Sequence, residues 1–163
     1  MLRTLAARIF GFEEEIAELE EKVKALSWDT AYGMWTRGAF LQFCQVMPRG
    51  RRTVVFIDFD EVHIHNRDHG YTEVDRRIRA SFSVPFRSSD LVARWYSGDE
   101  MVILFDGDHD FAESALRELE ESAKSNGLTF KCEIGIWEVG KRPVEEVVEE
   151  LSNKIAMQKP VER

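Results

Sequence analysis

Two apolar segments separated by a short polar turn lie in the middle of this chain, and a pair of adjacent carboxylates lies in that turn. The first segment is 90–95 (DLVARW) and the second is 102–105 (VILF). This pattern predicts a β-hairpin over about 91–105, with Asp99 and Glu100 at its turn. Adjacent carboxylates repel each other, but their oxygens are the ligands that hard divalent cations prefer. The turn is therefore a candidate metal site.

A second strand-like segment that ends in carboxylates lies upstream of the hairpin. It runs as VVFI over 54–57 and is followed by Asp58, Phe59 and Asp60. If this strand and the hairpin are neighbours in one sheet, Asp58 converges with the acidic pair of the turn. Three carboxylates around Mg²⁺ indicate nucleotide chemistry.

Length and composition limit the class of protein. The chain has 163 residues, of which 44% are hydrophobic and 11% are aromatic, so it is predicted to form one folded domain plus an appendage. Its formal net charge of -8 argues against a protein that binds nucleic acid nonspecifically, because such a protein needs a basic surface.

The cysteines and the apolar segments indicate a cellular compartment. Cys44 and Cys132 have no metal-site spacing and lie in apolar surroundings, so we expect buried free thiols in a reducing compartment rather than a disulfide. No apolar stretch is long enough for a membrane span, and the N-terminus lacks the apolar region of a signal peptide. We therefore expect a cytoplasmic protein.

The N-terminal segment has a heptad repeat. Its apolar positions alternate in steps of three and four, and they are Leu2, Leu5, Ile9, Phe12, Ile16, Leu19, Val23 and Leu26. The stripe is narrow, which favours a parallel coiled-coil dimer over a single amphipathic helix packed on its own domain. The sequence thus predicts a dimerisation and signalling helix over 1–27 and a separate domain over 28–163.

The rest of the chain alternates between strand and helix patterns. The expected elements are a turn at 29–33, a helix capped by Thr36 and running to about Val46, strands at 53–59 and 128–137, helices at 72–82 and 110–125, and a last helix after Pro143. Residues 61–71 look polar and irregular. The order predicts an α+β fold, a ferredoxin-like palm sheet with flanking helices on one face.

The order of these motifs resembles the GGDEF domain of diguanylate cyclases, over roughly 29–163. Four stretches match the patterns of that family. The opening D-x-L-T-G-L-x-N-R-R-x-F motif is partly present as Asp29, Gly33, Arg37 and Phe40. The first catalytic stretch is present as Asp58, Asp60, Asn66, Gly70 and Asp75. The signature pentapeptide is Ser97-Gly98-Asp99-Glu100-Met101, and the C-terminal Lys and Arg are Lys159 and Arg163.

The resemblance implies a role for each site residue. Asp58, the carbonyl of Phe59, Asp99 and Glu100 would bind two Mg²⁺ (or Mn²⁺) ions on a triphosphate. Asn66 and Asp75 would bind guanine, and Gly98 would allow the backbone to approach the nucleotide closely. The phosphate-binding residues would be His63, which stands where the family has Lys, together with Lys159 and Arg163.

A second site is implied by the tetrapeptide Arg87-Ser88-Ser89-Asp90. It matches the R-x-x-D motif at which the family binds the product, cyclic di-GMP, as an inhibitor away from the active site. Arg binds guanine and phosphate with two hydrogen bonds, and Asp accepts hydrogen bonds from the guanine edge. The alternative is an ion pair in an exposed loop.

The resemblance implies a diguanylate cyclase that condenses two GTP into cyclic di-GMP and pyrophosphate, as a homodimer controlled by an upstream sensor domain or protein. Substitutions at Val62, His63 and Arg67 favour an alternative, a degenerate domain that only binds GTP or cyclic di-GMP. A cyclase with a mixed purine product is a third reading, against which Asp75 argues. The hairpin also has one residue more than the family between Arg94 and the signature, so either Trp95 takes the Arg position or the turn carries a bulge.

Overall fold

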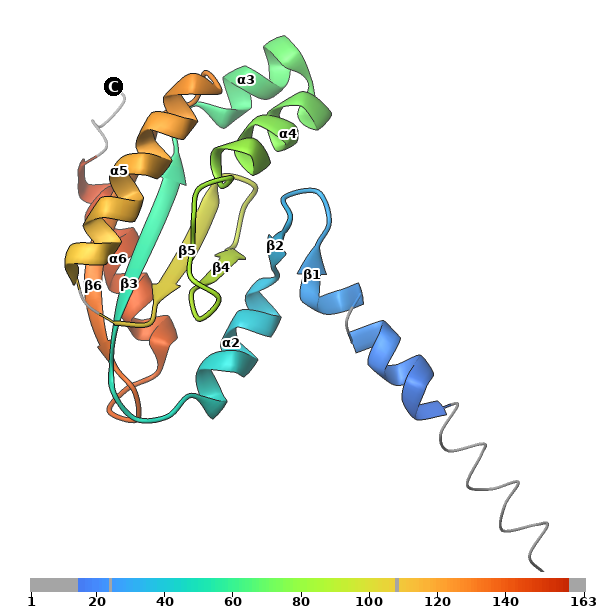
Figure 1. Cartoon of the computed structure of the whole chain (residues 1–163). Helices are drawn as coiled ribbons and strands as arrows, with labels where there is room; N and C mark the ends of the chain where they lie inside the picture. Colours follow the sequence, from blue (N-terminus) through green and yellow to red (C-terminus); the bar gives the residue numbers. More distant parts are fainter. Residues whose placement is uncertain (1–14, 24, 108, 159–163) are drawn as a thin grey trace, which may run out of the picture.

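The computed structural model describes residues 15–23, 25–107 and 109–158. Residues 15–23 and 25–27 are helical. The elements that follow (Figure 1) are β1 (Trp28–Asp29), β2 (Met34–Trp35), α2 (Arg37–Val46), β3 (Arg51–Phe59), α3 (Val62–His69), α4 (Tyr71–Ser81), β4 (Leu91–Arg94), β5 (Glu100–Phe105), α5 (His109–Ser125), β6 (Phe130–Glu138) and α6 (Val144–Gln158).

The described strands form one six-stranded sheet with the order β1-β2-β4-β5-β3-β6. Strand β3 pairs antiparallel with both β5 and β6, and β4 pairs antiparallel with β5. The short β2 joins β4 in parallel at the other edge of this group. The order β4-β5-β3-β6, with crossovers through helices, is the ferredoxin-like arrangement, so the predicted fold class is confirmed.

Helices cover both faces of the sheet. On one face, β3 residues Val55 and Ile57 pack with the buried side chains of α4 and α5. On the other face, Val54 and Phe56 pack with α2 and α6. The expectation that helices lie on one face is therefore wrong. The apolar run in β3 includes residues of both parities, and such a strand must be buried on both sides.

Most predicted elements are present, with one clear exception. Thr36 caps α2, since its side chain accepts a hydrogen bond from the N–H of Ala39. The prediction of irregular structure at 61–71 is wrong, because α3 occupies 62–69. In α3 only Val62 is buried, so the segment lacks the apolar periodicity from which helices are recognised.

The N-terminal helix projects away from the sheet (Figure 1), and part of its apolar stripe is described. Ile16, Leu19, Val23 and Leu26 are 54%, 53%, 57% and 77% exposed. The other four seam residues, Leu2, Leu5, Ile9 and Phe12, lie outside the described residues. The coiled-coil dimer and the domain boundary at 27–28 remain predictions.

Both cysteines are free, as expected from the sequence. Cys44 is buried and Cys132 is partly buried. Burial raises the pKa of the Cys44 thiol to about 12. Within the described ranges, no helix combines the length and the apolar character needed to cross a membrane.

The close packing of β6 on α6 is testable at Gly135. A Cβ at this position would lie 3.1 Å from Cδ2 of Leu151, and Val147 is also in contact. We expect Gly135→Val to lower the free energy of unfolding by ~1–3 kcal/mol, because the two added methyl groups have no space. Denaturant unfolding at equilibrium measures the change.

The control for this experiment is Gly38→Ala in α2. A Cβ at position 38 meets nothing within 4 Å, and Ala favours helix over Gly. This variant should unfold at the same or a higher denaturant concentration. Equal midpoints for Gly135→Val and the unmodified protein would contradict the described packing.

Candidate functional site

Three charged side chains form one row across the sheet where β3 ends. Asp58 of β3 lies opposite Glu100 of β5 and, on its other side, opposite Lys131 of β6. Residues directly opposite each other in antiparallel strands have Cβ atoms about 4.5–5.5 Å apart and share a face. The row lies on the face that packs against α2 and α6, since Asp58 has the same parity as Val54 and Phe56. The predicted convergence of Asp58 with Glu100 is therefore present.

This row places two like charges and one opposite charge side by side. Two carboxylates directly opposite each other destabilise a sheet, and Asp58 is only 8% exposed. The Oε2 atom of Glu100 is buried and has no hydrogen-bond partner among the described residues. Lys131 directs its Nζ atom to Oδ1 of Asp60, at 3.5 Å. A buried acceptor without a donor fits a bound cation, because a cation supplies the missing positive charge.

Asp99 lies beside this row, in the hairpin turn. Its backbone carbonyl accepts a hydrogen bond of 2.9 Å from the N–H of Phe59, which fixes the turn to the end of β3. Its carboxylate accepts a hydrogen bond from the Ser97 hydroxyl. Among the described side chains, no group of three or more His, Cys, Asp or Glu is arranged to hold a metal ion. The metal-binding roles of Asp58, Phe59, Asp99 and Glu100 stay predictions.

Regular pairing in the hairpin extends to Trp95. Arg94 lies opposite Met101, and the N–H of Trp95 donates to the carbonyl of Glu100 at 2.8 Å. The paired strands therefore contain no bulge at this end, and the turn over 96–99 takes up the extra residue. Trp95 does not occupy the position of the family's Arg, because its side chain is buried in the core beside Phe40.

A cavity of about 360 Å³ lies next to the carboxylates. Helices α3 and α4, the hairpin turn and the loop between β1 and β2 contribute its walls, and the lining residues are Ala31, Tyr32, Val62, His63, Asn66, Tyr71, Asp75, Arg94, Gly98 and Asp99. Five of these were predicted from the sequence as site residues, namely His63, Asn66, Asp75, Gly98 and Asp99. The fold thus brings the predicted base-binding residues to the carboxylates.

Asn66 has a buried side-chain oxygen that is available to accept a hydrogen bond from a ligand. Its Oδ1 atom is buried and has no hydrogen-bond partner among the described residues. An amide oxygen in this state accepts a hydrogen bond from a donor that enters the cavity, and such a bond removes the cost of its burial. Donors of this kind are present on the edge of a purine.

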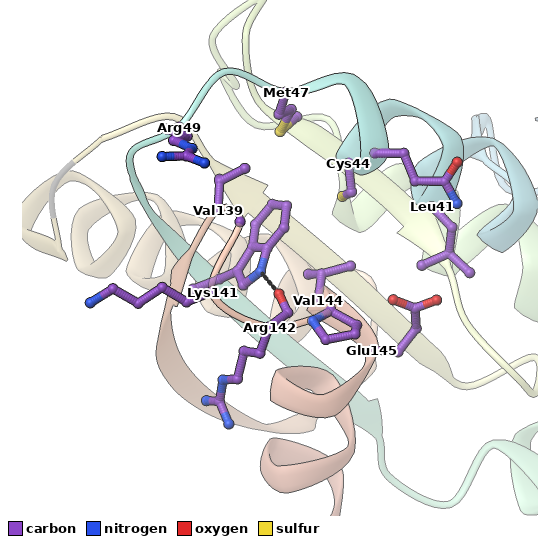
Figure 2. A pocket seen from close by; sticks show the side chains of 13 residues that line it. Leu41, Cys44, Met47, Arg49, Val139, Lys141, Arg142, Val144 and Glu145 are labelled. Carbon is purple, nitrogen blue, oxygen red and sulfur yellow. Dashed lines mark hydrogen bonds between the residues drawn. The ribbon is translucent and has the colours of Figure 1, made fainter.

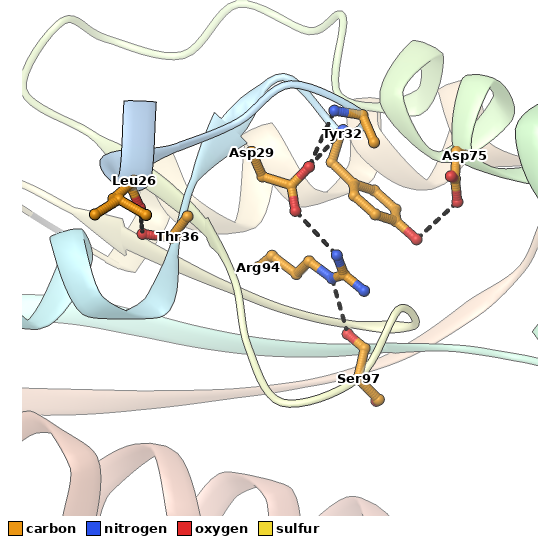
Figure 3. A network of polar contacts seen from close by, with 8 residues as sticks. Leu26, Asp29, Tyr32, Thr36, Asp75, Arg94 and Ser97 are labelled. Atoms are coloured by element: carbon orange, nitrogen blue, oxygen red, sulfur yellow. Dashed lines mark hydrogen bonds and ion pairs between the residues drawn. The ribbon is translucent and has the colours of Figure 1, made fainter. Parts of the chain in front are cut away.

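A polar network joins the cavity to the hairpin and to the end of the N-terminal helix (Figure 3). Arg94 donates from Nη1 to Oδ2 of Asp29 at 2.9 Å, and its Nε atom approaches the carbonyl of Ser97 at 3.5 Å. The Thr36 hydroxyl donates to the carbonyl of Leu26 at 3.0 Å. The loop that follows the helix is therefore held to both the helix and the signature turn.

Tyr32 extends this network into the cavity. Its hydroxyl donates to Oδ1 of Asp75 at 2.8 Å, and the side chain is 5% exposed (Figure 3). The guanidinium of Arg94 lies over the Tyr32 ring, 4.6 Å from its centroid. Burial and the hydrogen bond to Asp75 raise the pKa of Tyr32 well above its ordinary value, so the hydroxyl remains a donor at neutral pH.

The predicted product site lies in the turn before β4. Asp90 is 9% exposed, and its two carboxylate oxygens accept hydrogen bonds from the backbone N–H groups of Arg87 and Asp106, at 2.8 and 3.2 Å. The Arg87 guanidinium lies 3.5 Å from the ring centroid of Phe111. Both side chains therefore support the turn, and their role in binding a ligand stays a prediction.

The predicted phosphate-binding residues at the C-terminus, Lys159 and Arg163, lie outside the described residues. Helix α6 ends at Gln158, whose side chain donates to Oε1 of Glu133 at 2.5 Å. Glu133 lies two residues from Lys131 along β6, on the same face of the sheet.

The sequence reasoning missed Tyr32 and Lys131. Lys131 falls in the predicted strand at 128–137, and only the pairing of that strand with β3 shows that it lies opposite Asp58. Tyr32 stands at the Thr position of the opening motif, and its larger size was the available signal. Lys131 has no such signal in its local sequence, and the partners of both residues become visible only in the tertiary structure.

A larger cavity of about 690 Å³ lies at the other end of the sheet (Figure 2). Its floor includes Cys44 and Trp137, and Trp137 donates from Nε1 to the carbonyl of Arg142 at 2.9 Å. The charges at its rim are largely paired, since Lys141 contacts Glu138 and Arg142 contacts Glu150. It contains none of the predicted site residues.

Comparison with known proteins identifies the fold. No protein-family model and no curated protein matches the sequence. Among solved structures, the coiled coil and GGDEF domain of DgcB from Caulobacter crescentus, in complex with c-di-GMP, has a TM-score of 0.70 and 18% identity, with 94% of this chain and 93% of that chain covered.

Two further structures have the same architecture. The diguanylate cyclase SiaD from Pseudomonas aeruginosa, in complex with its activator SiaC, has a TM-score of 0.63 and 19% identity, over 96% of this chain and 68% of that chain. The GGDEF domain of FimX from Pseudomonas aeruginosa has a TM-score of 0.62 and 19% identity, over 82% of this chain and 95% of that chain. These similarities show that the chain has the fold of a GGDEF domain.

Proposed function

We propose that this chain is a diguanylate cyclase of the GGDEF family, which condenses two GTP molecules into cyclic di-GMP and releases pyrophosphate. The observation that carries this proposal is one cavity lined by Asn66, Asp75 and Asp99, where Asp99 directly precedes Glu100 of the Asp58–Glu100 pair. The fold is shared with the diguanylate cyclase SiaD and with the GGDEF domain of DgcB in complex with c-di-GMP.

The cavity suits guanine. The Asp75 carboxylate accepts hydrogen bonds from N1–H and the 2-amino group of guanine, and Oδ1 of Asn66 accepts from a donor on the same base. Adenine presents an unprotonated N1 to the same carboxylate, so an acceptor faces an acceptor. Gly98 lines the cavity and lets the backbone approach the nucleotide. GTP is the substrate that these groups favour.

The carboxylates suit Mg²⁺ or Mn²⁺. Asp58, the carbonyl of Phe59, Asp99 and Glu100 would hold two ions. The Oε2 atom of Glu100, which has no hydrogen-bond partner within residues 15–23, 25–107 and 109–158, fits this role. Such ions neutralise charge that develops on the phosphates and lower the pKa of the attacking 3′-hydroxyl. Three further residues, His63, Lys159 and Arg163, would bind the phosphates.

The proposed reaction requires two copies of the chain. Each copy has one guanine cavity, so the two 3′-hydroxyls reach the opposite α-phosphates only when two sites face each other. The exposed apolar stripe of Ile16, Leu19, Val23 and Leu26 supports a homodimer through the N-terminal helix. Association through that helix would raise the effective concentration of one site near the other. An upstream sensor domain or protein would act on this helix.

The alternative is a receptor that binds GTP or cyclic di-GMP without catalysis. It is favoured by His63, which lacks the fixed positive charge of Lys, and by Arg67 beside Asn66. In the proposed cyclase, Arg87 and Asp90 form a product-inhibition site, and in a receptor the same residues would bind the signal. The two functions differ in whether the metal-binding carboxylates are needed.

Incubation with GTP and Mg²⁺ tests the proposed reaction. We expect cyclic di-GMP and pyrophosphate, identified by mass spectrometry, and we expect EDTA to abolish turnover and excess Mg²⁺ to restore it. Replacement of Asp99 and Glu100 by Ala should lower turnover by at least ~100-fold, since charge stabilisation by the ions is lost.

The binding of cyclic di-GMP by the same double variant separates the two functions. An enzyme loses turnover in this variant, whereas a receptor has none to lose and keeps its affinity for cyclic di-GMP. If the unmodified protein makes no product at any protein concentration but binds cyclic di-GMP, the cyclase proposal is wrong and the receptor is correct.

The contribution of the N-terminal helix is tested by Ile16→Asp combined with Leu19→Asp. Two charges in the apolar stripe should prevent association, so turnover per chain should fall at least ~tenfold at low protein concentration and recover as the concentration rises. Sedimentation velocity measures association in the same samples.

A matched control places the same charges off the stripe, at Ala17→Asp and Ala25→Asp. This control should keep both the dimer and its turnover, because neither position belongs to the heptad seam. Full turnover by a chain that sedimentation shows to be a monomer would contradict the proposed role of the helix.

A further inference from the structure

Tyr32 contacts the base-reading carboxylate, and the function proposed above does not use it. Its hydroxyl lies 2.8 Å from Oδ1 of Asp75, although the two residues are 43 positions apart in the sequence. We propose that Tyr32 is a specificity-determining residue, which holds the Asp75 carboxylate in the orientation that selects guanine over adenine. This inference rests on the proposed function, because it assumes that the cavity binds GTP.

Tyr32 is itself fixed from several directions. Its side chain is 5% exposed, and the Arg94 guanidinium covers its ring at 4.6 Å. Its backbone N–H donates to Oδ1 of Asp29 at 3.2 Å, and Asp29 in turn holds Arg94 at 2.9 Å. The hydroxyl therefore has one position, and the atom to which it donates is held there as well.

A fixed carboxylate discriminates between bases better than a mobile one. An Asp side chain on a helix exchanges between rotamers, and each rotamer presents its oxygens differently. If Asp75 turns away, the repulsion between its oxygens and the unprotonated N1 of adenine is relieved. The hydrogen bond from Tyr32 opposes this rotation, so the penalty against adenine is retained.

The hydrogen bond from Tyr32 leaves acceptor capacity for the base. An ionised carboxylate has about four lone-pair sites on its two oxygens, and the Tyr32 hydroxyl uses one of them. Guanine requires two, for N1–H and the 2-amino group. The Tyr32 hydroxyl remains protonated at neutral pH, so it stays a donor to Asp75 while the base is bound.

Tyr32 forms a wall of the cavity and does not fill it. With the side chain in place the cavity measures about 360 Å³, within the range of small-ligand sites. A Cβ at Gly98 would lie 3.0 Å from the Tyr32 hydroxyl oxygen. A side chain at position 98 would therefore displace the Tyr32 hydroxyl by a few tenths of an ångström, and the hairpin turn forms the adjoining part of the wall.

Nucleotides that cannot react separate base recognition from turnover. We would measure the affinities for 3′-deoxy-GTP and 3′-deoxy-ATP by isothermal titration calorimetry with Mg²⁺, since both lack the attacking hydroxyl. Tyr32→Phe removes the hydrogen bond and keeps the ring. We expect about tenfold weaker binding of 3′-deoxy-GTP and a similar fall in the preference for it over 3′-deoxy-ATP, as expected from the loss of one hydrogen bond to a charged group.

Tyr96→Phe is the matched control. Tyr96 is 72% exposed, its hydroxyl accepts a hydrogen bond from Nη2 of Arg37 at 3.0 Å, and it does not line the cavity. This variant should keep the nucleotide preference of the unmodified protein. In an Asp75→Asn background, Tyr32→Phe should cause no further change in preference, because the carboxylate on which it acts is absent.

The outcomes distinguish this inference from the proposed function. If the unmodified protein prefers 3′-deoxy-GTP and Tyr32→Phe keeps the same preference, the inference is wrong and the proposed function stands. Equal weakening of both nucleotides would also overturn it, since that result indicates a purely structural role. If the unmodified protein binds neither nucleotide, both the proposed function and the inference fail. Thermal unfolding of Tyr32→Phe verifies that the variant is folded.

Discussion

The burial of β3 on both faces and along both edges is the constraint on which the rest of the structure depends. Residues 54–57 are at most 1% exposed, so every backbone N–H and C=O of this segment needs a partner, and β5 and β6 provide them. Helices α4 and α5 must cover one face, and α2 and α6 the other. Asp58 lies near the end of this strand and is 8% exposed, so its charge stands at the margin of the core.

This constraint explains which parts of the molecule were predictable. The apolar run before Asp58 and the two segments of the hairpin are local patterns, and they gave the central strands and the convergence of Asp58 with Glu100. Helix α3 was missed because only one of its residues is buried, so its sequence has no repeating pattern of apolar residues. The contact between Tyr32 and Asp75 depends on how the loop after β1 lies against α4, and no local pattern contains that information.

The charges at the end of β3 show that stability alone does not account for the site. Asp58 and Glu100 oppose each other, and Lys131, which shares their row, pairs with Asp60. Asp58 faces the opposite charge of Lys131 on one side and the like charge of Glu100 on the other, and only the pairing with Glu100 is unfavourable for the sheet. The Oε2 atom of Glu100, which is buried and accepts from no donor in the described part of the chain, adds to this cost. A bound cation would offset both the repulsion between Asp58 and Glu100 and the cost of burying the Glu100 oxygen. The row and the cavity lined by Asp99 are therefore interpreted as one site.

One short segment, residues 28–36, connects the N-terminal helix to both parts of the site. It contacts the helix where Thr36 donates to Leu26, the hairpin turn through Asp29 and Arg94, and α4 through Tyr32 (Figure 3). A change in the direction of the helix would therefore act on Asp75 and on the hairpin turn at 96–99 through the same residues. A dimer formed by this helix would not only bring two sites together. In the proposed cyclase it would also hold the segment whose Tyr32 donates to Asp75, so that association and guanine recognition would depend on one set of contacts.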